Sequence, residues 1–578
     1  MGFPFRERIR WLYSWGLALL AAGIAGGLAV LALYRGLGLS STGVDDAYIF
    51  AVYAHHWVEG KGLVYNPGDG PVEGFTSPLW LLITAAIHRL GLPWEIGALG
   101  ASLVLFVFLL AWTLRGIGGP QWWRSPGALF AGVWLLSSPG FVAWNTISLM
   151  DTILLSLGIA AISLDLWDGI PGPLRELFIV FLILARPEGG VWALVWIGLD
   201  ALRAYLISKP ARLWPRIARL LLTYTIAVMA LMAWRAQTFG DLLPNTYYAK
   251  RIAPLDAFQS GFVYLMLFLL TYPAGAFAFL AGGYTAFRRL SEIARLLRSP
   301  FPLDSPYPDL IRLLLLTLLT SAGLALPLLT GADHFPMFRF YQPVWFPLGL
   351  LLLVLGRLQT HRVASKWMTT PLSQTIAALL PILLSLLSQD NYAALHTSHH
   401  AQRMKFEIDL AAQGCILGQK MNRIFDPIYP EVAIITAGGF RSEYKGKVFD
   451  LMGLNDREMA RAERWHPPGF PGHVAFRSEV FFRRSPPVVL PYDDTTGYGL
   501  NLLMTNLEFN NSVLKGLLSS GEFYRRYRLV RIRRSDEAII AFVEHSFADR
   551  SATLGLTVET IQWPPPADDD RGTAGGQE

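Results

Sequence analysis

The sequence predicts a polytopic α-helical membrane protein with about 11 transmembrane helices, followed by a C-terminal extracytoplasmic α/β domain. Three observations predict this class. Hydrophobic residues make up 53% of the 578 residues and charged residues only 16%, which excludes an ordinary soluble enzyme. Many apolar runs approach the length of a membrane-spanning helix. The hydropathy then falls from about Ser388 onward.

The membrane part is expected to cover residues 1–387 and to begin inside the cell. Arg6, Arg8 and Arg10 precede the apolar run 11–34, which is longer than a signal-peptide core and lacks a clear cleavage site. We therefore interpret it as a retained first span. Eight further clear candidates are 96–114, 127–141, 152–166, 220–234, 262–286, 313–329, 344–355 and 372–387.

Two segments are ambiguous, and charge asymmetry decides between their alternatives. Segment 77–92 contains His88 and Arg89 and is short, so it fits an interfacial helix. Segment 174–201 is broken by the sequence Arg-Pro-Glu-Gly-Gly at its middle, so it fits two short spans. This choice gives 11 spans and places 19 Lys and Arg residues in cytoplasmic stretches against eight in the outer loops. The N-terminus is then cytoplasmic, and interfacial helices occupy about residues 45–92 of the first outer loop.

The C-terminal part reads as a soluble extracytoplasmic α/β domain over residues 388–563. Short apolar runs alternate there with polar turns and predict strands at 432–437, 448–452, 488–490, 529–532 and 538–543. The tail 564–578 has almost no apolar content and is expected to be disordered.

Every unusual polar cluster of the membrane part falls in an outer loop under this topology. Two adjacent carboxylates, Asp45 and Asp46, follow the first span, where keeping them for packing alone would be costly. Five loops separated in sequence are predicted to converge on one shared site. Its candidate residues are Asp45, Asp46, Tyr48, Glu73, Asp151, Arg186, Glu188, Asn245, Tyr248, Lys250, Asp333, His334 and Arg339.

These residue types suit group transfer from a lipid phosphate. A carboxylate deprotonates an acceptor hydroxyl, while Arg and Lys hold a phosphate leaving group whose charge grows in the transition state. Adjacent carboxylates also suit a divalent cation, although the remaining ligands of such a metal site are unknown from sequence.

Each candidate also has a purely structural interpretation. One of the two aspartates fits a helix N-cap as well as a catalytic role. Arg186 and Glu188 fit an ion pair across a hairpin turn, and Arg339 fits an interfacial anchor. His334 fits a turn or hydrogen-bonding role better than metal ligation.

Several motifs together resemble a known family. The run DDAYIFAVYAHHWVEGKGLVYNPGDGPVEGFTSPLW resembles the first outer loop of GT-C superfamily glycosyltransferases, in particular the branch of mycobacterial terminal arabinofuranosyltransferases that use decaprenyl-phosphoryl arabinose. Further matching motifs are ARPEG at 185–189, LPNTYYAK at 243–250, GADHFPMFRF at 331–340 and DLMGLNDR at 450–457.

The resemblance implies a GT-C-like fold and a role for some of these residues. An aspartate of the first loop is the presumed general base of that family, so the role passes to Asp45 or Asp46. Arg186, Lys250 and Arg339 lie in its motifs and are expected to contact the donor phosphate. Two motifs depart from the family pattern: Asp151 replaces a usual glutamate, and Gly-Ala-Asp-His ending at His334 replaces the usual Gly-Gly-Asp-Trp.

The sequence thus predicts an inverting glycosyltransferase of the plasma membrane that moves a sugar from a polyprenyl phosphate to a glycan, glycolipid or protein acceptor on the extracytoplasmic face. Arabinofuranose is the sugar that the resemblance implies. The expected partners are this donor, the acceptor and membrane lipid, with no nucleic acid. One alternative is a transporter or flippase of lipid-linked or anionic solutes. Such proteins tend to place charges near the bilayer midplane in repeated halves, and no repeat occurs here. A second alternative is a structural membrane protein whose soluble domain binds a partner.

Overall fold

A computed structural model describes residues 5–207, 213–292, 307–360, 370–467, 469–470, 472–490 and 509–562. Its contacts divide the chain into two compact units. The first unit comprises 1–44, 76–242 and 254–408, and the second comprises 45–75, 243–253 and 409–578. The second unit therefore includes two segments that precede the predicted domain boundary at residue 388. The predicted tail 564–578 lies outside the described residues.

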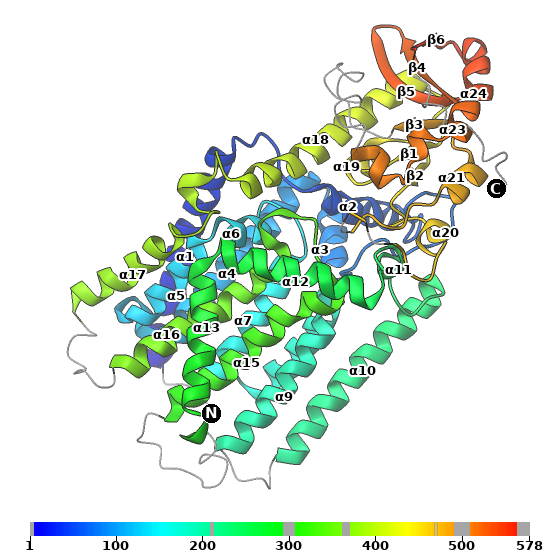
Figure 1. Cartoon of the computed structure of the whole chain (residues 1–578). Helices are drawn as coiled ribbons and strands as arrows, with labels where there is room; N and C mark the ends of the chain where they lie inside the picture. Colours follow the sequence, from blue (N-terminus) through cyan, green and yellow to red (C-terminus); the bar gives the residue numbers. More distant parts are fainter. Residues whose placement is uncertain are drawn as a thin grey trace, which may run out of the picture. The chain divides into compact units, whose positions relative to one another are not determined.

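The first unit consists of helices, drawn mostly in blue to green in Figure 1. Prolines and serines begin many of them: Ser77, Ser125 and Ser138 each accept a hydrogen bond from a backbone N–H of the first turn. The helices are α1 (Phe5–Leu37), α3 (Pro78–Arg89), α4 (Trp94–Gly118), η1 (Gly119–Arg124), α5 (Pro126–Ser137), α6 (Pro139–Asn145), α7 (Thr152–Asp168), α8 (Gly172–Ala185), α9 (Gly189–Ile207), α10 (Leu213–Phe239), α12 (Pro254–Thr271), α13 (Pro273–Arg288), α15 (Tyr307–Thr330), η3 (Pro336–Val344), α16 (Trp345–Thr360), α17 (Pro371–Ser385) and η5 (Tyr392–Ala394).

The apolar helices confirm the polytopic membrane class. Seven of the described helices are long and apolar enough to cross a bilayer, or eight if the bent pair α5 and α6 is one span. This number is below the predicted 11, because α7, α8 and α17 have only 17, 14 and 15 residues. The orientation of the spans stays a prediction.

Two breaks in the helices test the predicted spans directly. The predicted single span 262–286 is wrong, because Pro273 ends one helix and begins the next, giving α12 and α13. The predicted division of 174–201 is confirmed, since α8 ends at Ala185 and α9 begins at Gly189. Helix α3 has 12 residues and is therefore about 18 Å long, too short to cross a bilayer by itself.

A tryptophan pair fixes α5 against α16 inside the first unit. The rings of Trp134 and Trp345 stack with centroids 4.4 Å apart. Each indole N–H donates to the other residue's carbonyl oxygen, at 2.8 and 3.0 Å. A Cβ on Gly349 would come within 2.4 Å of the Trp134 ring, so only glycine permits this approach. Reciprocal bonds of this kind satisfy both buried N–H groups and orient the two helices.

The second unit contains one mixed sheet with helices around it. The strands are β1 (Val432–Ile434), β2 (Val448–Asp450), β3 (Val488–Leu490), β4 (Tyr527–Arg534), β5 (Glu537–Glu544) and β6 (Thr557–Thr560). The described helices are α2 (Asp45–Val58), α11 (Asn245–Ala249), α19 (Gly439–Glu443), α20 (Arg457–Ala460), α21 (Ser478–Arg484), η6 (Leu517–Ser519), α23 (Gly521–Arg526), α24 (His545–Arg550) and η7 (Ser551–Leu554); α18 (His399–Phe425) begins in the first unit and continues into this one.

The sheet order is β2-β1-β3-β5-β4-β6. The three short strands β1, β2 and β3 are parallel and buried along their whole length, as expected for apolar strands covered on both faces. The hairpin β4–β5 and the edge strand β6 are antiparallel, and Figure 1 draws them in orange to red. All five predicted strands are confirmed, while β6 was missed because its side chains are mostly exposed.

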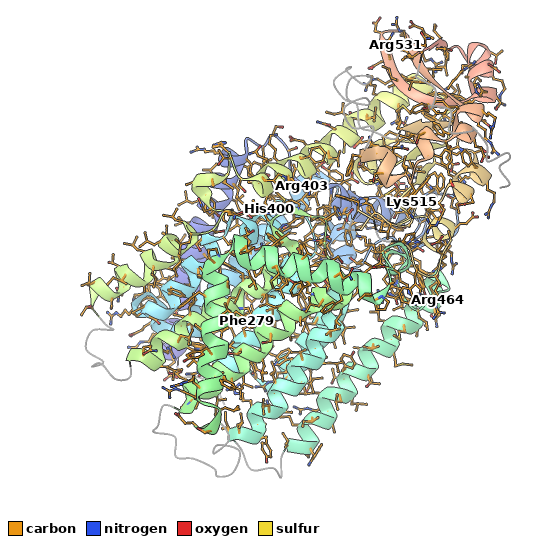
Figure 2. The ribbon with its side chains drawn as sticks, viewed as in Figure 1. Phe279, His400, Arg403, Arg464, Lys515 and Arg531 are labelled. Atoms are coloured by element: carbon orange, nitrogen blue, oxygen red, sulfur yellow. The ribbon has the colours of Figure 1, made fainter. Side chains whose placement is uncertain are left out.

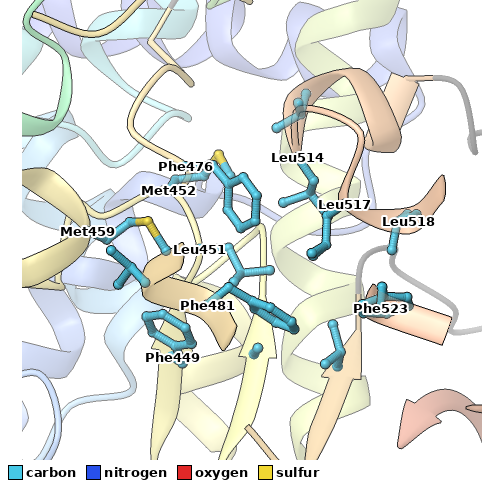
Figure 3. Packing of buried hydrophobic residues seen from close by; sticks show 14 of the residues in the cluster. Phe449, Leu451, Met452, Met459, Phe476, Phe481, Leu514, Leu517, Leu518 and Phe523 are labelled. Atoms are coloured by element: carbon cyan, nitrogen blue, oxygen red, sulfur yellow. The ribbon is translucent and has the colours of Figure 1, made fainter. Parts of the chain in front are cut away.

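An aromatic and aliphatic core lies between the sheet and the loops that follow its strands. Phe449 and Leu451 contribute from the end of β2, and Phe481 contributes from α21 (Figure 3). Met452, Met459, Phe476, Leu514, Leu517 and Phe523 belong to the same cluster. These side chains are at most 2% exposed, which gives the second unit a hydrophobic core of its own.

Helix α2 lies where interfacial helices are predicted, and most of it is covered by protein. Ten of its 14 residues are buried, including Tyr48 and His56. An interfacial helix leaves one broad apolar face for lipid, whereas α2 exposes only His55 and Trp57. The apolar residues of α2 are therefore core residues.

Candidate functional site

The predicted site residues fall into two groups, one in each unit. The first unit holds Asp151, Arg186, Glu188, Asp333, His334 and Arg339. The second unit holds Asp45, Asp46, Tyr48, Glu73, Asn245, Tyr248 and Lys250. The structure thus brings together three of the five predicted loops in the first unit, and segments of the other two in the second.

Arg186 is the centre of the first group. It follows α8, and its guanidinium donates from Nη1 to Asp151 Oδ1 and from Nε to Glu188 Oε1, each at 2.6 Å. The turn after Arg186 is so tight that a Cβ on Gly189 would lie 1.8 Å from the Leu182 carbonyl oxygen. Asp151 is fully buried and also accepts from Thr76 Oγ1 at 3.4 Å. The glycine of the ARPEG motif therefore positions Arg186 between two carboxylates.

A second buried ion pair joins Asp333 to Arg339. The contact is bidentate, with Nε–Oδ2 at 2.7 Å and Nη2–Oδ1 at 3.1 Å. The guanidinium carbon of Arg339 also lies 4.3 Å from the Phe335 ring centroid and 5.6 Å from that of Trp144. Aromatic faces and a forked carboxylate hold an arginine in one geometry. His334 Nδ1 is 3.7 Å from Asp333, beyond hydrogen-bond distance.

The two ion pairs influence one another electrostatically. Burial raises the pKa of Asp151, while the positive charges of Arg186 and Arg339 act in the opposite direction. Burial acts to lower the pKa of Arg186, but the charges of Asp151 and Glu188, with a smaller contribution from Asp333, raise it. With three carboxylates and two guanidiniums, the group has no excess positive charge for an anion in this arrangement.

Asp45 has a defined structural environment in the second unit. Its carboxylate accepts hydrogen bonds from the backbone N–H groups of Gly438 at 2.9 Å and Gly439 at 2.8 Å. A Cβ on Gly438 would lie 1.8 Å from the Asp45 carbonyl oxygen, so this approach requires glycine. We call the two glycines and their N–H groups the glycine cradle. Burial raises the pKa of Asp45 to about 6, although the two backbone bonds act to lower it.

Asp46 is arranged differently from its neighbour. Its side chain is half-buried, and no hydrogen bond or ion pair to it occurs among the residues that the structure describes. Its negative charge contributes to raising the pKa of Asp45. Of the two carboxylates, Asp46 is therefore the one available to a ligand.

The other predicted residues of the second unit are mostly occupied by contacts within it. Asn245 donates from Nδ2 to the carbonyl oxygens of Gly453, Leu454 and Asp456 at 2.9, 3.0 and 3.2 Å. This ties α11 to the loop after β2. Tyr48 and Glu73 are buried, at 3% and 2% exposure. Lys250 is half-buried and has no acidic partner among the described residues.

Sequence reasoning missed a buried carboxylate in the second unit. Asp450 ends β2 and accepts hydrogen bonds from the N–H groups of Met452 at 2.9 Å and Asn455 at 2.8 Å. Asn455 Nδ2 donates to the same carboxylate at 2.9 Å. Burial raises the pKa of Asp450 to about 7. The DLMGLNDR motif contains both residues, so the signal was present, but nothing in it identified Asp450 as buried.

No group of three or more His, Cys, Asp or Glu residues that could hold a metal ion occurs in the described part of the chain. The adjacent carboxylates Asp45 and Asp46 do not make such a group with any third ligand there. The divalent cation considered from sequence therefore finds no supporting donor set among these residues.

Comparison with known proteins gives only distant likenesses. No family model matches the chain, and no curated protein sequence matches it. Among solved structures, ArnT from Cupriavidus metallidurans in the apo state is 13% identical with a TM-score of 0.49, covering 91% of this chain and 98% of that one. The same protein bound to undecaprenyl phosphate gives 12% and 0.49, with the same coverage. The oligosaccharyltransferase AglB from Archaeoglobus fulgidus, in complex with an inhibitory peptide and a dolichol-phosphate, gives 11% and 0.48, covering 93% of this chain and 75% of that one. Likenesses at this level do not identify what the chain does.

Proposed function

We propose that the protein is a membrane glycosyltransferase that moves a sugar from a polyprenyl-phosphate donor to an extracytoplasmic acceptor. The observation that carries the proposal is the difference between the environments of Asp45 and Asp46 at the start of α2. Asp45 is bound to the glycine cradle, while the adjacent Asp46 has no such partner among the described residues. The resemblance of the surrounding loop to GT-C enzymes supports the same reading.

In the proposed reaction, Asp46 is the general base. Its carboxylate takes the proton of an acceptor hydroxyl as that oxygen attacks the anomeric carbon of the donor sugar. The bond from this carbon to the phosphate oxygen breaks, and its electron pair leaves with the polyprenyl phosphate. Because one displacement occurs on the face opposite the leaving group, the anomeric configuration inverts.

The leaving phosphate requires positive charge. The resemblance implies Arg186, Arg339 and Lys250 as the residues that supply it, since a guanidinium or ammonium stabilises the charge that develops on the phosphate. Arg186 is paired with both Asp151 and Glu188. The side chain of Glu188 is 19% exposed and that of Asp151 is 0% exposed. Glu188 is therefore the carboxylate that an incoming phosphate replaces, while Asp151 keeps Arg186 oriented.

The finer parts of the proposal follow from the resemblance alone. They are an arabinofuranose or another pentose or hexose as the donor sugar, and a cell-envelope glycan, glycolipid or protein as the acceptor. An N-terminus inside the cell and a C-terminal domain outside it follow from the positive-inside rule. Tyr48, Glu73, Asn245, Tyr248, Asp333 and His334 are proposed to shape the substrate sites of their respective units.

The test compares two isosteric substitutions one residue apart. Purified Asp46→Asn protein should insert and fold normally but lose about 10²- to 10⁴-fold in transfer rate with a panel of polyprenyl-phosphate sugars. Asp45→Asn should instead lower stability, with smaller loss of rate per folded molecule. Normal transfer by Asp46→Asn would overturn the assignment of the base. Movement of intact lipid-linked sugar across vesicles without any transfer would favour the transporter alternative.

A further inference from the structure

A group of cations and aromatic rings lies on two neighbouring segments of the second unit. We call it the basic aromatic cluster. The first segment is α11 with the loop that follows it, and the second is the loop that follows α20. An isolated parallel bridge pairs Ile252 of the first segment with His466 of the second. The members of the cluster are Tyr247, Tyr248, Arg251, Arg461, Arg464 and Trp465.

The arginines of the cluster are fixed by stacking. The guanidinium carbon of Arg251 lies 3.9 Å from the ring centroid of Trp465 and 5.7 Å from that of Tyr247. Arg461 covers Tyr248 at 4.2 Å in the same way. Stacked guanidiniums lose little further conformational freedom when they bind an anion, because the rings already hold their planes.

Acidic residues near the cluster are paired with cations elsewhere. Glu458 forms an ion pair with Arg483, and Glu463 forms one with Arg477. Arg251 and Arg464 have no acidic partner in the described part of the chain, and Arg251 Nε is buried without a hydrogen bond. These two residues therefore carry positive charge that the described part of the protein does not neutralise.

The surface also offers features that suit sugar rings. Trp465 and Tyr247 are 37% and 45% exposed, so part of each ring can lie against a ligand. Cationic donors and partly exposed aromatic faces together match an acidic saccharide.

A lipid surface fits this cluster less well. Membrane-binding faces insert large apolar side chains beside their cations. Tyr247 and Trp465 are the only exposed large hydrophobic residues among the described residues of the two segments, and neither segment exposes a Leu, Ile or Val side chain there. Figure 2 shows Arg464 at the edge of the ribbon, on the α11 and α20 side of the second unit.

We propose that the basic aromatic cluster binds an acidic saccharide, meaning a glycan that carries carboxylate or phosphate groups, and that this glycan is the acceptor or a part of it. The site would select the acceptor by charge and by ring stacking. This inference goes beyond the proposed transfer reaction, because glycan binding by the cluster requires neither the donor nor Asp46.

Binding of an acidic and a neutral oligosaccharide tests the proposal. Full-length protein in nanodiscs of zwitterionic lipid is titrated by calorimetry with a hexamer of galacturonic acid and, separately, with maltohexaose. The acidic hexamer should bind. Arg251→Gln and Trp465→Leu should each lower the affinity for it by about tenfold or more, since each removes a charged or stacking contact. The affinity of Arg251→Lys should fall between those of Arg251→Gln and the unsubstituted protein. Arg531→Gln is the matched control, because Arg531 lies at the β4 end of the second unit in Figure 2 and pairs with Glu559.

Several outcomes would overturn the proposal. Equal binding of the neutral hexamer would remove the role of charge, and unchanged binding by Arg251→Gln would remove the role of the cluster. Binding only to vesicles that contain anionic lipid would assign the cluster to a membrane surface. If inorganic phosphate at the same concentration as the hexamer displaced the hexamer, the basic aromatic cluster would be a simple anion site. Glycan binding is measured without donor, so failure of glycan binding and failure of transfer are separable.

Discussion

Substitution of Gly438 by alanine should open the glycine cradle and release Asp45. The added Cβ would lie 1.8 Å from the Asp45 carbonyl oxygen and 3.0 Å from its Cγ, so the backbone of one segment must move. The movement breaks or lengthens the two bonds that the Gly438 and Gly439 N–H groups donate at 2.9 and 2.8 Å.

The size of the effect follows from those two bonds. A hydrogen bond to a charged group contributes about 1.5–3 kcal/mol, and Asp45 accepts two of them. Part of this gain already offsets the burial of the charge, since the pKa of Asp45 is raised to about 6 despite both bonds. A net loss of about 2–4 kcal/mol of local stability is therefore expected, which corresponds to about 30- to 1,000-fold faster opening.

Hydrogen exchange measured by mass spectrometry on peptides that cover residues 436–444 is the direct assay, because it reports local opening without requiring two-state unfolding. Gly521→Ala is the matched control. A Cβ there would meet only the flexible end of the Arg525 side chain at 3.8 Å. Exchange in Gly438→Ala within about threefold of this control would refute the reasoning, because the loss of even one charge-assisted bond exceeds that factor.

Two further predictions concern Glu188 and the buried carboxylate Asp450. Glu188→Gln should tighten binding of polyprenyl phosphate by about tenfold in detergent-based calorimetry, since it removes the charge of the more exposed carboxylate paired with Arg186. Weaker binding would contradict the proposed exchange of Glu188 for phosphate. For Asp450, burial raises the pKa from 3.8 to about 7, so the folded state favours the protonated form. Its contribution to stability is therefore present below about pH 4 and is lost as the pH rises toward about 7, by on the order of 4 kcal/mol. Thermal unfolding of the full-length protein between pH 5 and 8 should depend less on pH in Asp450→Asn, and identical profiles would contradict this role.

Local signals in the sequence predicted much of the fold. Apolar runs bounded by polar turns located five of the six strands, because the parallel strands are buried on both faces and need continuous apolar residues. The Arg-Pro-Glu-Gly-Gly sequence located the break between α8 and α9, because proline and glycine disfavour the interior of a helix. Pro273 carried an equivalent signal at the end of α12, but the apolar residues around it suggested one continuous span.

Contacts between distant segments could not be predicted in this way. The apolar residues of α2 fit an interfacial helix and a buried helix equally well, and only the packing of the second unit distinguishes the two. Asp45 and Gly438 are 393 residues apart in the sequence, so no local pattern predicts their contact in the glycine cradle. Arg251 and Trp465 were missed for this reason too, since neither is unusual until the other is placed against it.

The cradle explains why two adjacent aspartates occur where one helix cap would suffice. The two hydrogen bonds to the Asp45 carboxylate fix the first turn of α2. Asp46, the next residue, is held in place by the same turn but does not bind the glycine cradle. Asp45 is then a positioning residue, and its buried charge costs stability that two glycines partly offset. Asp46 stays half-buried with its oxygens unoccupied by described neighbours, as the proposed role of general base requires. Loss of the cradle should therefore lower the transfer rate even though neither glycine touches a substrate in the proposed reaction.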